Sequence, residues 1–189
     1  MPWLSGDIFG FSGPVTQMQT LAIRLRDLTR FSHVALCCEY AGQVLLWEST
    51  TLCNVPCFIC GKLHSGTQAT DPETRVKNYH GSVYWMRLRD KLAPSEVQRL
   101  AYWLIREYGK PYDMKQCLWS IPSLHLYPSQ GYDDSSWFCS EQVWAALQHV
   151  KRIPVDILAA AMRPAHVMRW LPRWGVYTAP QKIEQTCAT

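Results

Sequence analysis

The segment HVALCCEYAGQVLLWEST, residues 33–50, contains two apolar runs on either side of an Ala-Gly pair. Valine, leucine and tryptophan are typical of strands, and the Ala-Gly pair suits a turn between them. We therefore expect a β-hairpin that spans about residues 33–49. Opposite residues of such a hairpin have numbers that add to 82 or 83. His33 is then opposite position 49 or 50, one or two residues from Glu48.

Helical and extended patterns alternate along the rest of the chain. Apolar spacing predicts helices over 15–29, from Pro94 to Gly109, around Cys139 and, more briefly, near 154–162. We expect a third strand over 82–88, a loop-rich segment over 50–80, and a Trp-rich stretch leading into a tail over 176–189. No repeat or composition break divides residues 1–189, so we expect one α+β domain with an antiparallel sheet packed against helices.

Composition excludes several classes of protein. The chain has 189 residues, 48% of them hydrophobic, and a net charge of +4 with scattered lysines and arginines, so no nucleic-acid partner is expected. The N-terminus lacks the pattern of a secretory signal, and no apolar run approaches the ~18 residues of a membrane span. A cytoplasmic protein with free thiols is the expectation for its 8 cysteines. The oligomeric state stays open.

Cys139 begins the helical pattern in SSWFCSEQVWAAL, residues 135–147. With Ser135 or Ser136 as the N-cap, Cys139 falls in the first turn, where the helix dipole favours a thiolate. The N–H groups of that turn have no helical acceptor and suit an oxyanion hole. These features predict a nucleophile, although position alone equally allows an inert buried cysteine.

His33 and Glu48 are the candidate partners of this cysteine. A carboxylate that accepts a hydrogen bond from one imidazole nitrogen fixes the tautomer, so the other nitrogen can accept the thiol proton. The hairpin register brings His33 and Glu48 close enough for such a bond. The alternative interpretation of Glu48 places it on the solvent face of an edge strand.

Five segments together resemble a known family of enzymes. SGDIFGF, FSHVAL, LLWESTT, YGKPYDM and WFCSEQV follow one another in the order, and at about the spacing, found in the circularly permuted papain-fold hydrolases. The resemblance is to the YiiX-like branch of the NlpC-type peptidases, which is related to the lecithin retinol acyltransferase group. It covers about residues 5–160. Each piece is weak alone, but the ordered combination is fairly specific.

The resemblance implies a papain-like fold and a cysteine hydrolase that works through a thioester acyl-enzyme. It implies Cys139 as nucleophile, His33 as general base, Glu48 as the group that orients the base, and Tyr112 as a substrate-binding residue. A tyrosine packed in a loop is the alternative for Tyr112, and Glu141 is expected to support the start of the helix. The implied substrates are peptide-like amides, cell-wall fragments or lipid acyl groups.

A cysteine-rich segment departs from the family pattern. Cys53, Cys57, Cys60 and His64 form C-x3-C-x2-C-x3-H within twelve residues. A zinc site is conceivable, but four ligands this close rarely surround one ion, and the chain is short for the radical-SAM proteins that use C-x3-C-x2-C. We expect no metal and no cofactor. The alternative function is a non-catalytic binding module of the same fold in which this cluster has a metal or redox role.

Overall fold

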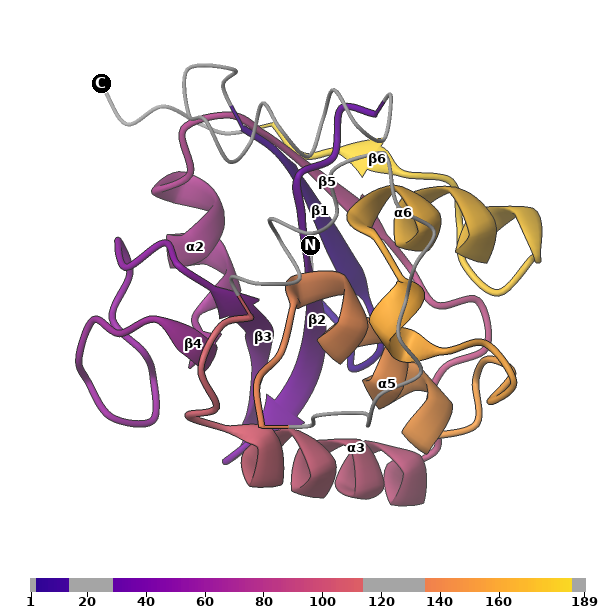
Figure 1. The fold of residues 1–189 in the computed structure, drawn as a ribbon, viewed down its shortest axis with the longest axis horizontal. Coiled ribbons are helices and arrows are strands. Elements are labelled where there is room, and N and C mark those ends of the chain that lie inside the picture. The colour runs from indigo at the N-terminus through magenta and orange to yellow at the C-terminus, as the bar shows by residue number, and fades with distance from the viewer. Residues whose placement is uncertain (1–2, 14–28, 114–134, 185–189) are drawn as a thin grey trace.

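The computed structural model describes residues 3–13, 29–113 and 135–184, and in these ranges the chain is an α+β protein built on one antiparallel sheet (Figure 1). The strand order is β4-β3-β2-β1-β5-β6. The strands are β1 (Ile8–Ser12), β2 (His33–Tyr40), β3 (Gln43–Thr50), β4 (Gly66–Thr70), β5 (Ser82–Met86) and β6 (Gln181–Lys182).

The predicted hairpin is confirmed as β2 and β3. Leu36 pairs with Trp47 and Tyr40 with Gln43, so opposite residues have numbers that add to 83. The turn uses positive φ angles at Ala41 and Gly42, 52° and 81°, which the glycine adopts without steric cost. The hairpin lies in the interior of the sheet, with β4 and β1 on its two sides.

Side chains alternate along β2 and divide the interior into two cores. Val34 and Leu36 belong to the larger core, which includes Cys139 and most of the helical residues that are buried. Ala35 and Cys37 belong to a smaller core on the other face, together with Phe11. Residues 33, 35 and 37 therefore share one face of the sheet, and residues 34, 36 and 38 the other.

The helices of the described ranges are α2 (Pro72–Lys77), α3 (Pro94–Glu107), α5 (Cys139–His149) and α6 (Pro164–Arg173). Two were predicted: α3 starts at its proline, as expected, and α5 holds Cys139 in its first turn. In Figure 1 α5 lies in front of the sheet, and it packs against β2 and β3. α3 lies along the bottom edge in that view.

Three sequence predictions need correction. The segment 50–80 is not only loop, because β4 pairs with β3 and α2 follows it, capped by the Asp71 carboxylate on the Thr74 N–H. The polar composition of both elements hides them from an apolar pattern. The helix expected near 154–162 is a single 3-10 turn, η1 (Ala159–Ala161). The Trp-rich stretch forms α6, which buries Leu171, and the buried Tyr177 follows it.

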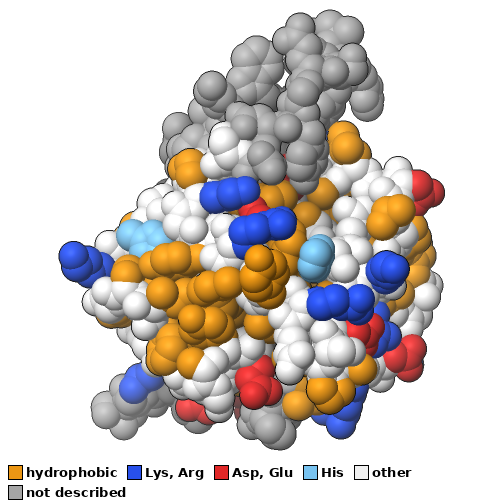
Figure 2. Space-filling view, turned by 90° about the horizontal axis from the view of Figure 1, so that it is seen from below, with side chains coloured by type: hydrophobic (Ala, Val, Ile, Leu, Met, Phe, Trp, Pro, Cys, Tyr) orange, Lys and Arg blue, Asp and Glu red, His pale blue; other side chains and the backbone are white. Residues whose placement is uncertain are grey.

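Two further predictions concern other parts of the chain. The helix predicted over 15–29 lies almost entirely outside the described residues, as do Cys117 and Cys187. No helix among the described residues is long and apolar enough to cross a membrane. Figure 2 shows a continuous hydrophobic area on the side of the molecule where α3 lies. Large hydrophobic side chains that are exposed in the described ranges include Phe58, Leu63 and Tyr102.

Candidate active site

His33, Glu48 and Arg75 form a buried hydrogen-bonded network. His33 Nε2 lies 2.6 Å from Glu48 Oε2, as the hairpin register predicted. Arg75, from α2, donates from Nε to Oε1 at 2.6 Å and from Nη2 to Oε2 at 3.0 Å. Glu48 and Arg75 are both 0% exposed, so the interpretation of Glu48 as a surface residue is wrong.

The charge of Glu48 decides the tautomer of His33. Burial raises the pKa of Glu48, but the Arg75 guanidinium and the His33 ring lower it by more, to about 2. Glu48 is therefore a carboxylate near neutral pH and can only accept hydrogen bonds. His33 must then carry a proton on Nε2, and in the neutral ring Nδ1 is the basic nitrogen.

The lowered pKa of Glu48 predicts a loss of stability in acid. An unfolded glutamate titrates near 4.5, so the folded-state stabilisation is complete above that pH and is lost as the pH falls through about 2. We expect this group to cost on the order of 3 kcal/mol of unfolding free energy over that window. Urea unfolding at pH 6, 4 and 2 measures it. Glu48→Gln is the control, and a pH dependence as steep in this variant as in the parent would contradict the assignment.

The N-cap of α5 is Phe138, one residue before Cys139. The predicted N-caps Ser135 and Ser136 are not the cap, since Phe138 holds that position and its N–H donates to Glu141 Oε2 at 3.3 Å. Glu141 thus supports the helix start, as expected. Cys139 is the first residue of the helix, where the N–H groups have no acceptor within it.

Glu141 has a raised pKa and keeps its proton to a higher pH than an ordinary glutamate. Burial raises its pKa to about 7, and the negative charge of Asp113 adds to the increase, against the lowering effect of the Phe138 N–H. The unfolded chain would release this proton near 4.5. Glu141 therefore favours the folded state most below that pH, and this contribution is lost as the pH rises through 7.

The segment just before Cys139 is held by four hydrogen bonds at Trp137. Its carbonyl accepts from Ser49 Oγ at 2.7 Å and from the Asp113 N–H at 3.0 Å. Its own N–H donates to the Pro111 carbonyl, and its indole donates to Glu107 at 2.9 Å. Because Ser49 follows Glu48 on β3, these bonds fix the start of α5 at the sheet end that carries Glu48.

Cys139 and His33 lie at this same end of β2 and β3 but belong to different faces of the sheet. Cys139 is 0% exposed and lies in the larger core. The His33 ring packs against Phe11 of the smaller core, with ring centroids 5.3 Å apart. His33 is the first residue of β2, where a side chain can reach around the strand end. The contact between the Cys139 sulfur and the His33 ring stays a prediction.

Tyr112 lies beside the start of α5. Its backbone forms an isolated parallel bridge with Trp137, and its ring lies 5.8 Å from the Phe138 ring, centroid to centroid. The predicted substrate-binding residue thus lies beside the two residues that precede Cys139, while its role stays a prediction.

Cys37 and Cys38 are core residues, as expected. Burial raises the pKa of the Cys37 thiol well above its usual value and that of Cys38 to about 12. Both thiols therefore stay protonated near neutral pH and lack the thiolate that a nucleophile or metal ligand needs.

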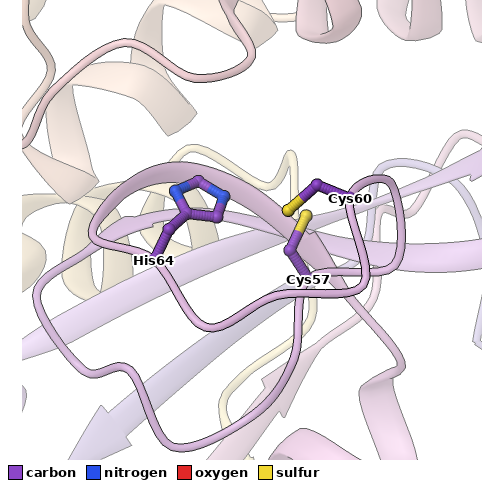
Figure 3. A group of neighbouring side chains, drawn as sticks. All are labelled: Cys57, Cys60 and His64. Atoms are coloured by element: carbon purple, nitrogen blue, oxygen red, sulfur yellow. The ribbon is translucent and has the colours of Figure 1, made fainter.

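Cys57, Cys60 and His64 are the residues that could hold a metal. Their side chains lie close together in the loop between β3 and β4 and point toward one another (Figure 3), with ligand atoms within 4.8 Å of each other. Cys53, the fourth member of the predicted cluster, is not part of this group. Its thiol donates instead to the Thr51 carbonyl at 3.5 Å.

Arg75 is the residue that sequence reasoning missed. The Asp71-Pro72 pair marks the start of its helix, but nothing in the local pattern connects Arg75 with Glu48, 27 residues away. A glutamate within an apolar strand run was the available signal, because a buried carboxylate requires a positively charged partner.

Comparison with known proteins supports the fold. No protein-family model matches the chain, and a search of curated proteins finds no match. A crystal structure described as metalloprotein yiiX from Escherichia coli O157:H7, DUF1105, superposes with a TM-score of 0.59 over 97% of each chain at 17% identity. This chain therefore has a YiiX-like fold.

Proposed function

We propose that this protein is a cysteine hydrolase of permuted papain-like fold, with Cys139 as nucleophile, His33 as general base and Glu48 as the residue that positions His33. The observation that carries the proposal is the buried His33–Glu48–Arg75 network. It keeps a carboxylate on one nitrogen of the imidazole at the sheet end where a cysteine begins a helix. A histidine with a fixed tautomer suits a general base in acyl transfer.

The proposed reaction has two halves. His33 Nδ1 takes the proton of Cys139, and the thiolate attacks the carbonyl carbon of an amide or ester. The N–H groups of the first turn of α5 stabilise the oxyanion, and the C–N or C–O bond breaks as the leaving group takes the proton from His33. Water, deprotonated by His33, then attacks the thioester, which releases the acid and restores the thiol.

The substrate class follows from the family resemblance and the surroundings of Cys139. Peptide-like amides, cell-wall fragments and lipid acyl groups are the candidates. Tyr112 and Phe138 supply aromatic surface beside the helix start, which suits an apolar or flat acyl group. Cys139 is completely buried, so substrate entry requires the protein to open at this point.

Alkylation by iodoacetamide tests the nucleophile. Cys53 is the internal control, because it is exposed and lies outside the proposed site. Burial alone would make Cys139 react more slowly than Cys53, so faster labelling of Cys139 requires an activated thiolate and access to it. We expect Cys139 to be labelled first at neutral pH in peptide-resolved mass spectrometry.

The same measurement decides between an enzyme and the second candidate, a non-catalytic binding module of this fold. The complete burial of Cys139 favours this alternative. Labelling of Cys139 no faster than that of Cys53 would make the cysteine structural and reject the hydrolase.

A further inference from the structure

The loop between β3 and β4 is built around its two close cysteines. The Cys57 N–H donates to the Lys62 carbonyl at 2.9 Å, and the Gly61 N–H donates to the Cys57 carbonyl at 2.8 Å. Gly61 has a φ of 65°, which favours glycine. These bonds turn the C-x2-C-G segment back on itself, so Cys57 and Cys60 direct their sulfurs to one point (Figure 3).

His64 presents an unused nitrogen to the same point. Its Nδ1 lies 3.0 Å from the Ser65 carbonyl, to which it donates, so Nε2 carries the lone pair. His64 Nε2 is buried and has no hydrogen-bond partner among the residues that the structure describes. A buried nitrogen without a partner costs stability, and metal-binding histidines commonly have this arrangement, with the other ring nitrogen donating to a carbonyl.

Tyr108 contacts two of the three side chains. The Cys57 thiol donates to the Tyr108 hydroxyl at 3.8 Å, and the Tyr108 ring meets the His64 ring edge-on at 5.8 Å between centroids. Tyr108 therefore orients two members of the cluster.

We propose that Cys57, Cys60 and His64 bind one Zn²⁺ ion, with solvent as the fourth ligand. Two thiolates and an imidazole suit zinc, and three protein ligands with one open position are known from zinc sites. In a tetrahedral site two sulfurs lie about 3.8 Å apart, from Zn–S bonds of about 2.3 Å. Ligand atoms already within 4.8 Å need to move by only about 1 Å.

Binding is balanced in charge and protons. Each cysteine that is protonated releases its proton to solvent, and His64 binds through Nε2 as a neutral imidazole, so the bound site has no net charge. The ion would close the loop from Cys57 to His64. The segment between β3 and β4 also carries Asn54, whose side-chain oxygen accepts from Arg75 Nη1 at 3.4 Å, so the metal would brace this segment beside the Glu48–Arg75 pair.

Metal analysis of the purified full chain tests the site, independently of the proposed hydrolase. The protein is prepared with Zn²⁺ and a reducing agent, its metal content is measured by mass spectrometry, and its affinity by competition with a chromophoric chelator. We expect about one equivalent of zinc. Cys57→Ser, Cys60→Ser and His64→Gln should each weaken binding by more than the ~10–100-fold that losing an outer-shell partner costs. Circular dichroism checks that each variant folds.

Cys53→Ser and Cys139→Ser are the matched controls, and both should keep the metal at the affinity of the parent. Loss of zinc in Cys53→Ser would overturn the three-ligand assignment, and loss in Cys139→Ser would move the metal to the proposed catalytic cysteine. Zinc far below one equivalent in the reduced protein, or a Cys57–Cys60 disulfide that persists in place of the metal, would also overturn the proposal. Cobalt bound in its place should show thiolate charge-transfer absorption, and cobalt without it would contradict cysteine ligands.

Discussion

Replacing Arg75 by methionine should lower the free energy of unfolding by about 3–5 kcal/mol, the usual cost of breaking a buried ion pair from one side. Arg75 is 0% exposed and donates twice to Glu48, which is equally buried. Without the guanidinium, the Glu48 carboxylate keeps only its bond to His33 and stays in a medium that solvates charge poorly. Urea unfolding measures the change as a shift of the midpoint at constant slope.

Two variants make this result specific. Lys77 is an exposed cation on the same helix, and Lys77→Met should change stability by no more than about 0.5 kcal/mol. Glu48→Gln combined with Arg75→Met also removes the carboxylate charge that Arg75→Met alone leaves unpaired. The double variant should therefore lose less unfolding free energy than the two single variants lose in sum. Strict additivity, or an Arg75→Met protein as stable as the parent, would show that the pair contributes no such energy.

Replacing His33 by alanine should slow the acylation of Cys139 by about 10²–10⁴-fold, the usual contribution of a general base. p-Nitrophenyl acetate serves as a small acyl donor, and mass spectrometry follows the acetyl group on the cysteine. Glu48→Gln, which keeps the shape but removes the charge that fixes the tautomer, should also slow the reaction. Cys139→Ala should form no adduct at this position.

His80→Ala is the matched control, because His80 is exposed on the segment between α2 and β5. It should acylate at the rate of the parent protein. A His33→Ala protein that is acylated as fast as the His80→Ala protein would remove His33 from the reaction. The folded state of each variant is checked by its unfolding midpoint, so a lost fold is not mistaken for lost chemistry.

Local patterns were enough to predict the hairpin, α3 and the position of Cys139 in the first turn of α5. An Ala-Gly turn between two β-branched and aromatic runs specifies a register, and this register brings Glu48 within reach of His33. A proline followed by apolar residues at helical spacing specified α3. These signals lie within the segment itself, so the secondary structure they favour does not depend on contacts with the rest of the chain.

Polar elements and helix caps were beyond local patterns. β4 is a strand because β3 offers it a ladder of hydrogen bonds, although GTQAT has little apolar character. No helix was predicted for α6 because its tryptophans and proline obscure the helical spacing, yet packing on the sheet buries one side of it. Ser135 and Ser136 resembled caps by residue type, whereas hydrogen bonds at Trp137 from three other segments determine where α5 begins.

The sequence by itself determined which residues are chemically competent: a histidine one strand away from a glutamate, a cysteine at a helix start, and a cysteine-rich loop. Tertiary structure decided their partners. It brought Arg75 from α2 onto Glu48 and separated Cys53 from the group of Cys57, Cys60 and His64. It also placed Cys139 in the larger core, whereas the His33 ring packs against Phe11 of the smaller core. The physical reason is that residue type and spacing specify the secondary structure of a segment and the chemistry of its side chains. Which side chains come into contact depends on burial and charge pairing between segments that are distant in the sequence.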